Sequence, residues 1–411
     1  MAAKIEYIEV KGMKIPLIFE EDKRLPLVTM QFIFENGGSI ADTKAGLAKF
    51  SARVMGEGTS KLGSSAFAEA LESKAIHISS STGKETFVME LSCLKEEFDN
   101  GLKYFDSLLK DPNFSEEAIS KVKTTTLGAL ARKENDFDYI ASTELKALLF
   151  EGSALAQPSS GTVQSVKSIE VDDVKKFVKE HLVASRLIVV LGGDVELQEV
   201  KDKISKVIDT MAKGKPTALK NYSVRKSPKE KILIRETEQA YMYFGSPYHV
   251  AVGSEDYYKA RVATFILGSG GFGSRLMEEI RVKKGLAYSA YAKVHVSKSS
   301  SYMSGYLQTK LDSLEDAKKT VNEVMSDFVK NGVTKEELEQ TKKFLLGSEP
   351  LRVETMSQRL NRTFMDYYKG HELDHSQKEL ELIKKLKLKD LNKFIKEHKE
   401  ILEMSFAIVT K

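Results

Sequence analysis

Two kinds of apolar periodicity run along the chain. Residues 46–60, GLAKFSARVMGEGTS, carry apolar side chains at helical spacing, which predicts an amphipathic helix opened by Gly46 and ended by the Gly56/Gly58 pair. Residues 74–94 and 286–311 instead alternate apolar and polar side chains, which predicts pairs of strands. Cys93 lies on the apolar face of one such strand, so we expect a buried small side chain and not a nucleophile.

The same succession of elements occurs twice. FSEEAISKVKTTTLGAL (114–130) and VTKEELEQTKKFLLGSE (333–349) match at a constant offset of 219 residues, with Ser115 and Thr334 as helix N-caps. Each is preceded by a similar helix and, before that, by the alternating strands. Each half also ends in a capped amphipathic helix followed by an apolar strand. His181 and His398 are equivalent in these terminal helices, which favours a structural role over metal ligation.

The repeat defines the domain organisation. We expect an N-terminal domain over 1–212, a polar and basic linker over 213–231, and a C-terminal domain over 232–411. The fold class is α+β, with two homologous domains that each contain a mostly antiparallel sheet packed with helices.

Composition excludes several classes of function. Of 411 residues, 63 are basic and 59 acidic, spread along the chain, so we expect no nucleic-acid partner. The single cysteine excludes disulfides and thiolate metal sites within one chain. No signal peptide and no membrane span are visible, which makes the cytoplasm the default location, or the periplasm if a signal peptide has been removed.

Two short motifs match known sites by pattern alone. GSGGFG (268–273) has the spacing of a dinucleotide fingerprint between VATFIL, read as a strand, and the helix SRLMEEIRVKK. The acidic ribose ligand expected about 20 residues later is missing, so we expect the glycines to allow a close helix-to-strand approach instead. These glycines are Gly268, Gly270, Gly271 and Gly273.

HELDH (371–375) satisfies His-Glu-x-x-His, in which two histidines one turn apart bind zinc and the glutamate activates water. Glu397 is available as a third ligand but belongs to the repeated terminal helix. The polar surroundings favour a loop that leads into a helix capped by Asp374 or Ser376.

Lys49 and Arg53 stand one turn apart on the first predicted helix, which by itself indicates a solvated helix face. Residues 46–91, however, resemble the active-site segment of the pitrilysin/insulinase family of zinc peptidases, whose two-domain members include mitochondrial processing peptidases and small bacterial zinc peptidases. That family carries His-x-x-Glu-His, with both histidines on zinc and the glutamate as general base. The resemblance places these three functional positions on Lys49, Ala52 and Arg53, and the remaining glutamate ligand on Ala129. It therefore implies a degenerate zinc site and no metal in this chain.

SRLMEEIRVKKGLAYSAYA (274–292) resembles the second-domain segment of the same family, in which an arginine and a tyrosine seven residues apart reach across to the zinc domain. Here they are Arg281 and Tyr288. The resemblance implies that they are donors aimed at the scissile carbonyl of a peptide. Taken alone, the two residues indicate only an ion pair and a tyrosine at the edge of a core.

The resemblance implies half of a clamshell and two hypotheses of function. In the first, the chain is the non-zinc subunit of a heterodimeric zinc endopeptidase; a sister subunit with an intact motif holds the zinc, and this chain closes the cavity around unfolded peptides and supplies Arg281 and Tyr288. In the second, it is a catalytically empty scaffold or peptide-binding homodimer. Under either hypothesis, the basic pair Lys49 and Arg53 is expected to bind a substrate carboxylate or to pair with acidic groups on neighbouring helices, and the sequence does not choose between these.

Overall fold

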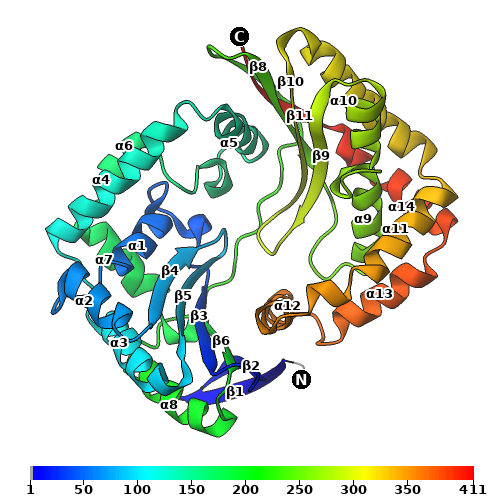
Figure 1. The fold of residues 1–411 in the computed structure, drawn as a ribbon. Coiled ribbons are helices and arrows are strands. Elements are labelled where there is room, and N and C mark those ends of the chain that lie inside the picture. Colours follow the sequence, from blue (N-terminus) through cyan, green and yellow to red (C-terminus); the bar gives the residue numbers. More distant parts are fainter. Residues whose placement is uncertain (1–2) are drawn as a thin grey trace. The chain divides into compact units, whose positions relative to one another are not determined.

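A computed structural model describes residues 3–411, and the chain forms two compact units (Figure 1). Unit 1 contains the chain up to Arg132, residues 158–219 and residues 352–367. Unit 2 contains residues 133–157, 220–351 and 368–411. Each unit has one sheet with helices packed against it, which confirms the predicted α+β class.

The sheet of unit 1 has the strand order β1-β2-β6-β3-β5-β4. Neighbouring strands are antiparallel except β2 and β6, which are parallel. The alternation read from the sequence places every second side chain of β5 in the core, Cys93 included. The strands are β1 (Lys4–Val10), β2 (Met13–Glu21), β3 (Leu27–Glu35), β4 (His77–Thr82), β5 (Thr86–Leu94) and β6 (Leu187–Gly193).

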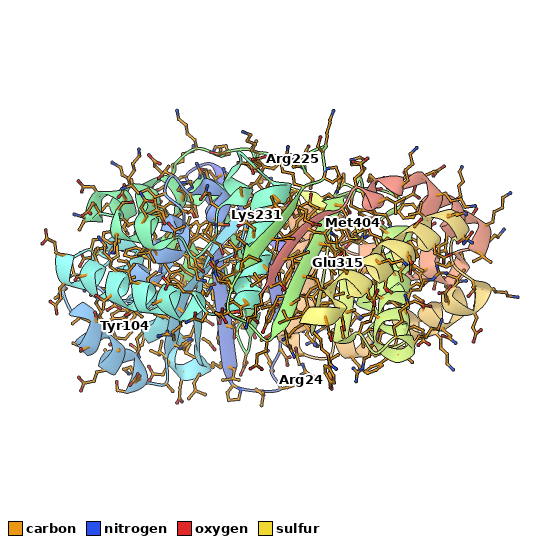
Figure 2. All side chains as sticks on the ribbon, turned by 90° about the horizontal axis from the view of Figure 1, so that it is seen from above. Arg24, Tyr104, Arg225, Lys231, Glu315 and Met404 are labelled. Atoms are coloured by element: carbon orange, nitrogen blue, oxygen red, sulfur yellow. The ribbon has the colours of Figure 1, made fainter. Side chains whose placement is uncertain are left out.

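Helices bury their apolar stripes against this sheet. Phe32 of β3 meets Phe105 of α3 edge to face, with ring centroids 5.0 Å apart. Side chains fill the space between sheet and helices (Figure 2). The helices are α1 (Leu47–Met55), α2 (Gly63–Glu72), α3 (Phe98–Lys110), α4 (Glu116–Lys133), α6 (Val163–Lys167), α7 (Val171–His181), α8 (Leu197–Thr210) and α12 (Met356–Lys369).

The sheet of unit 2 has the order β7-β11-β8-β10-β9 and is antiparallel except for the parallel pair β7 and β11. Its strands are β7 (Glu230–Ile234), β8 (Gln239–Pro247), β9 (Ala287–Val296), β10 (Ser301–Lys310) and β11 (Ser405–Thr410). Its helices are α5 (Phe137–Leu149), α9 (Tyr257–Thr264), α10 (Leu314–Asn331), α11 (Lys335–Gly347), α13 (His375–Lys385) and α14 (Leu388–Glu397), with π-helical segments η5 (Phe265–Ser269) and η6 (Met277–Lys283).

Short 3₁₀ turns complete both units: η1 (Ser39–Ala41), η2 (Lys95–Glu97), η3 (Ala154–Ala156), η4 (Ala184–Arg186), η7 (Leu311–Ser313), η8 (Pro350–Arg352) and η9 (Lys399–Leu402). No helix within residues 3–411 combines the length and the apolar character that crossing a membrane requires.

The repeat is visible in the elements, and one pair of equivalent helices is exchanged. Helices α4 and α11 begin 219 residues apart, at Glu116 and Lys335, as do α5 and α12, at Phe137 and Met356. Helix α5 nevertheless packs on β8 and β11 of unit 2, whereas residues 352–367 belong to unit 1. The compact units therefore differ from a division of the chain at the linker.

Two side chains fix α12 to the sheet of unit 1. Leu360 lies so close to Gly192 of β6 that a Cβ at Gly192 would come within 2.6 Å of its Cδ1. Arg359 donates from Nε and Nη2 to Oε1 of Glu20, at 2.9 and 2.5 Å. The Glu20 side chain is 1% exposed, so this ion pair lies inside the unit.

The two repeated histidines have the structural role that the sequence indicates. His181 packs against Phe177 one turn earlier, with the rings tilted and their centroids 4.5 Å apart, and His398 packs in the same way against Phe394 at 4.3 Å. Nδ1 of His181 lies 2.8 Å from the carbonyl oxygen of Asn36. Burial, together with the positive charge of Arg186, lowers the pKa of His181.

Candidate functional site

Helix α1 is built as the sequence predicts, between Gly46 and Gly56. Gly46 has φ 87°, a left-handed conformation that glycine adopts without strain. The Asp42 carboxylate accepts hydrogen bonds from the N–H groups of Gly46 and Ala48, at 2.9 and 2.7 Å, and so satisfies the start of the helix. Burial raises the pKa of Asp42 to about 7 against the effect of these two donors.

Lys49 and Arg53 point from α1 toward hydroxyl groups. Nζ of Lys49 donates to Oγ of Ser160 at 3.2 Å, and Nη1 of Arg53 donates to Oγ1 of Thr126 at 2.7 Å. Thr126 is buried on α4, one turn before Ala129. The Arg53 guanidinium thus joins α1 to α4 beside the position onto which the resemblance maps the last zinc ligand.

This set of side chains does not fit a zinc ion. An ammonium and a guanidinium offer donors only, and the methyl groups of Ala52 and Ala129 offer no lone pair. Within residues 3–411, no group of three or more histidine, cysteine or carboxylate side chains is placed to hold a metal.

The HELDH segment is a loop that leads into α13, with Asp374 at the N-cap position. The imidazole rings of His371 and His375 are stacked, with centroids 3.8 Å apart. Lys378 pairs with both Glu372 and Asp374. Glu397 pairs with Lys393 at the end of α14. The loop reading of this segment is therefore correct, and the structure assembles no zinc ligand set around it within the described residues.

In unit 2 the structure brings Arg281 and Tyr288 together. The Cζ of Arg281, on η6, lies 4.2 Å from the ring centroid of Tyr288, at the start of β9. Tyr288 exposes 81% of its surface to solvent. The guanidinium is therefore held by an aromatic ring, and the tyrosine belongs to the surface and not to the edge of a core.

The Gly-rich segment places a third side chain, Phe272, beside Arg281 and Tyr288. The ring centroid of Phe272 lies 4.6 Å from the Arg281 Cζ. Gly268 lies against β9, where a Cβ would come within 2.4 Å of the backbone nitrogen of Ala292. VATFIL, read from the sequence as a strand, is helical: it belongs to α9 and the start of η5, so that reading was wrong. A run of five apolar residues and one threonine fits either structure, and here both sides of a helix are buried.

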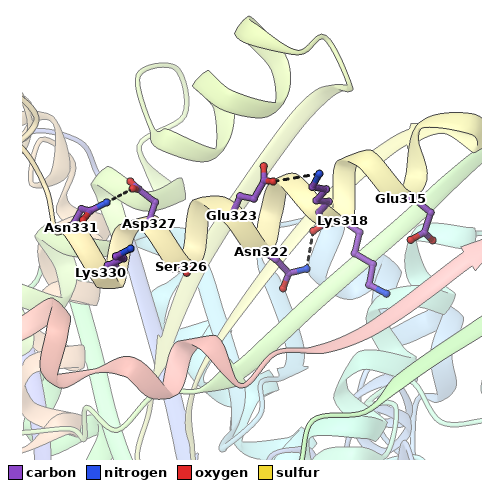
Figure 3. Close-up of a pocket in the computed structure, with 9 residues that line it drawn as sticks. Glu315, Lys318, Asn322, Glu323, Ser326, Asp327, Lys330 and Asn331 are labelled. Atoms are coloured by element: carbon purple, nitrogen blue, oxygen red, sulfur yellow. Dashed lines mark hydrogen bonds and ion pairs between the residues drawn. The ribbon is translucent and has the colours of Figure 1, made fainter.

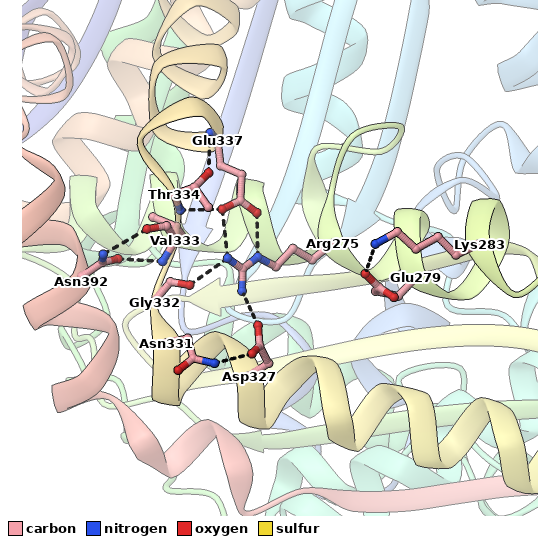
Figure 4. A network of polar contacts seen from close by, with 10 residues as sticks. All are labelled: Arg275, Glu279, Lys283, Asp327, Asn331, Gly332, Val333, Thr334, Glu337 and Asn392. Atoms are coloured by element: carbon pink, nitrogen blue, oxygen red, sulfur yellow. Dashed lines mark hydrogen bonds and ion pairs between the residues drawn. The ribbon is translucent and has the colours of Figure 1, made fainter.

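A polar network anchors Arg275, the first helical residue after the Gly-rich segment 268–273 (Figure 4). Arg275 donates from Nε and Nη2 to the two carboxylate oxygens of Glu337, at 2.7 and 2.9 Å, and from Nη2 to the carbonyl oxygen of Gly332 at 2.8 Å. Burial opposes ionisation of Glu337, but the Arg275 hydrogen bonds hold its pKa below the usual value. Asn392 donates to the carbonyl oxygen of Val333 and accepts from its N–H. The Gly-rich segment is therefore held at its C-terminal side by the turn between α10 and α11.

Two other candidate sites, a hollow on α10 and the Cys93 thiol, show no features of a functional site. The outer face of α10 carries a hollow of about 710 Å³, but Figure 3 shows it lined by polar side chains of that one helix, several paired with one another, as on a solvated helix face. Burial raises the pKa of the Cys93 thiol to about 11, so the thiol is protonated at neutral pH and is not a nucleophile.

The sequence analysis did not single out three residues that contact the candidate site residues: Thr126, Phe272 and Ser160. Thr126 carried a signal, because it precedes Ala129 by one turn and must share its helix face. Phe272 carried one as well, since it is the only large apolar side chain among the glycines of 268–273. Ser160 lies 111 residues from Lys49 in the chain, and no local pattern links the two.

Comparison with known proteins identifies the protein family to which the chain belongs. Residues 26–163 match the family model described as Insulinase (Peptidase family M16), and residues 168–345 match the model described as Peptidase M16 inactive domain. The chain belongs to peptidase family M16.

Individual relatives narrow this further. The protein of Helicobacter pylori (strain ATCC 700392 / 26695) named Non-peptidase homolog YmxG is 42% identical over 410 residues, which span 100% of this chain and 95% of that protein. Uncharacterized zinc protease YmxG of Bacillus subtilis (strain 168) is 25% identical, over 77% of this chain and 76% of that protein. The chain is thus similar, over its whole length, to a family member that carries the name of a non-peptidase homologue.

Solved structures agree on the fold. A peptidase M16 inactive domain from Pseudomonas fluorescens superposes with a TM-score of 0.91 at 21% identity, over 99% of this chain and 98% of that one. A protease from Helicobacter pylori superposes with a TM-score of 0.86 at 16% identity, over the full length of both chains.

Proposed function

We propose that this chain is the non-zinc subunit of a heterodimeric zinc endopeptidase and that it supplies Arg281 and Tyr288 to the active site of a sister subunit. The observation that carries the proposal is the contrast between the two units. The zinc positions of unit 1 hold side chains that cannot bind a metal, whereas Arg281 and Tyr288 of unit 2 lie together at the surface. A chain that acted only as a scaffold would not need to keep the half-buried Arg281 beside the exposed Tyr288.

The chemistry of the pair fits peptide hydrolysis. Attack of water on a peptide carbonyl places negative charge on the carbonyl oxygen, and donors that are already oriented stabilise that charge. A guanidinium and a phenol can both donate hydrogen bonds to that oxygen. A sister subunit with an intact His-x-x-Glu-His motif would hold the zinc and activate the water; this chain would hold the carbonyl oxygen. The substrates are unfolded peptides, in keeping with the peptidase family to which the chain belongs.

The proposal is tested first by capturing the chain from its native extract and identifying by mass spectrometry what co-elutes in stoichiometric amount. A sister chain of similar size with an intact zinc motif is the expected result. Recovery of this chain alone, as a homodimer or monomer, would contradict the proposal and favour the scaffold or peptide-binding alternative.

Reconstitution with that sister chain then tests the pair. Tyr288→Phe removes the hydroxyl and keeps the ring on Arg281, and kcat should fall about 10- to 1000-fold, the usual range for one oxyanion donor. Ser289→Ala, an exposed neighbour on the same strand, serves as the matched control. An unchanged kcat for Tyr288→Phe would show that the hydroxyl has no part in the reaction.

A further inference from the structure

Phe272 is an aromatic side chain placed where burial cannot explain it. The residue is 72% exposed, although Phe side chains normally contribute to stability by leaving water. Its ring lies against the Arg281 guanidinium, as described above, while the other ring on that guanidinium is Tyr288. Three successive elements, the Gly-rich loop, η6 and the start of β9, thus each contribute one member of an aromatic–arginine cluster: Phe272, Arg281 and Tyr288.

The backbone on both sides of Phe272 is shaped to present it. Gly271 has φ 66° and Gly273 has φ 90°, left-handed conformations that would strain any other common residue. Gly270 packs so tightly that a Cβ would come within 2.8 Å of the carbonyl oxygen of Phe265. With Arg275 anchored to Glu337, the loop is fixed at both ends. Gly271 and Gly273 therefore give the backbone the conformation in which Phe272 projects into solvent.

We propose that Phe272 is a positioning residue for Arg281, an inference that rests on the proposed function. An arginine has four rotatable side-chain bonds, and ordering them against solvent is unfavourable. Contact with a second ring restricts the guanidinium to a narrower set of orientations before a substrate arrives. Phe272 touches neither the metal nor the carbonyl oxygen in this scheme; it acts only through Arg281.

Kinetics of the reconstituted heterodimer test this, with internally quenched, unstructured peptides as substrate. Phe272→Ala should lower kcat about 2- to 30-fold, the range that one cation–π contact supports, with KM unchanged. Phe272→Tyr keeps a ring at this position and should retain the parental kcat. Val282→Ala, an exposed aliphatic neighbour of Arg281, is the matched control and should change nothing.

A double-mutant cycle separates positioning from direct action. In an Arg281→Ala background, Phe272→Ala should cause no further loss, because its effect passes through the missing guanidinium. A full additional loss in that background would overturn the inference, as would an unchanged kcat for Phe272→Ala in the parental background while Arg281→Ala is impaired. If Arg281→Ala itself leaves kcat unchanged, the proposed function fails, and with it the role that we assign to Phe272.

The contact can also be measured in the chain alone. The Arg281 Nε–Hε resonance should be shifted upfield by ring currents, partly restored toward the free-arginine position in Phe272→Ala, and unaffected in Val282→Ala. An identical Arg281 resonance in the parental chain and in Phe272→Ala would refute the positioning inference whatever the partner does. Because Phe272 is exposed, the melting temperature of Phe272→Ala should stay close to the parental value, which confirms that the variant is folded.

Discussion

Replacing Arg359 tests whether α12 is a structural part of unit 1. Arg359→Met removes two hydrogen bonds to Glu20 and leaves the Glu20 carboxylate, on a side chain that is 1% exposed, without that cation. The other carboxylate oxygen, Oε2, is buried and has no hydrogen-bond partner. Arg359 also donates from Nη1 to the carbonyl oxygens of Val353 and Glu354, at 3.0 and 2.7 Å, so the turn before the helix loses its contacts too. Breaking a buried ion pair on one side is unfavourable by about 3–5 kcal/mol.

Hydrogen exchange read by mass spectrometry localises this loss. Amides of β2 and β6 in unit 1 should exchange faster by about two to four powers of ten in Arg359→Met, while those of β8 in unit 2 should be unaffected. Arg352→Met, at an exposed arginine of the same segment, is the control. The double variant Glu20→Gln/Arg359→Met should recover most of the protection, because no buried charge is then left alone. Unchanged exchange in β2 and β6 would refute the reasoning.

Three further predictions concern the two units. Arg53→Met, which removes the contact to Thr126, should lower the free energy of unfolding of unit 1 by about 1 kcal/mol in urea titrations, with Lys61→Met as a surface control; a loss below the error would assign no bridging role to Arg53. His181 has a lowered pKa in the folded chain, so the unfolded chain binds more protons and stability should rise as the pH rises through the folded pKa and up to about 6.5, most clearly in the difference from His181→Gln, which cancels other titrating groups; a pH-independent difference would contradict the assignment. The purified single chain should contain no stoichiometric zinc by elemental analysis and should cleave no peptide, and chelator-sensitive cleavage by it would contradict the proposed function.

The local sequence pattern predicted most of the helices and strands, but it did not predict which elements pack against one another. The extent of α1 follows from two glycines and an apolar stripe, and the burial of Cys93 follows from strict alternation. The offset of 219 residues located α11 from α4 because capping residues repeat with the helix. By contrast, no local signal says which sheet a helix such as α5 will cover, since an apolar stripe fits any apolar face.

The same limit applies to the candidate sites: local pattern does not predict contacts between residues that are distant in the chain. Arg281 and Tyr288 were singled out only through a family resemblance, because two residues seven apart carry no spatial information until η6 and β9 are in place. The hydroxyl partners of Lys49 and Arg53 come from residues 111 and 73 positions away, beyond the reach of any local pattern.

The reciprocal exchange of α5 and α12 bears on how the chain arose and how it can be divided. Two equivalent helices, each of which completes the unit built mainly from the other half of the sequence, give the connectivity of a domain-swapped dimer whose two copies have become one polypeptide. A gene fragment that ends at the linker would encode a sheet that lacks its α12 and a helix α5 that lacks its sheet. The two fragments should therefore fold by complementing one another when they are expressed together, and neither should fold well alone.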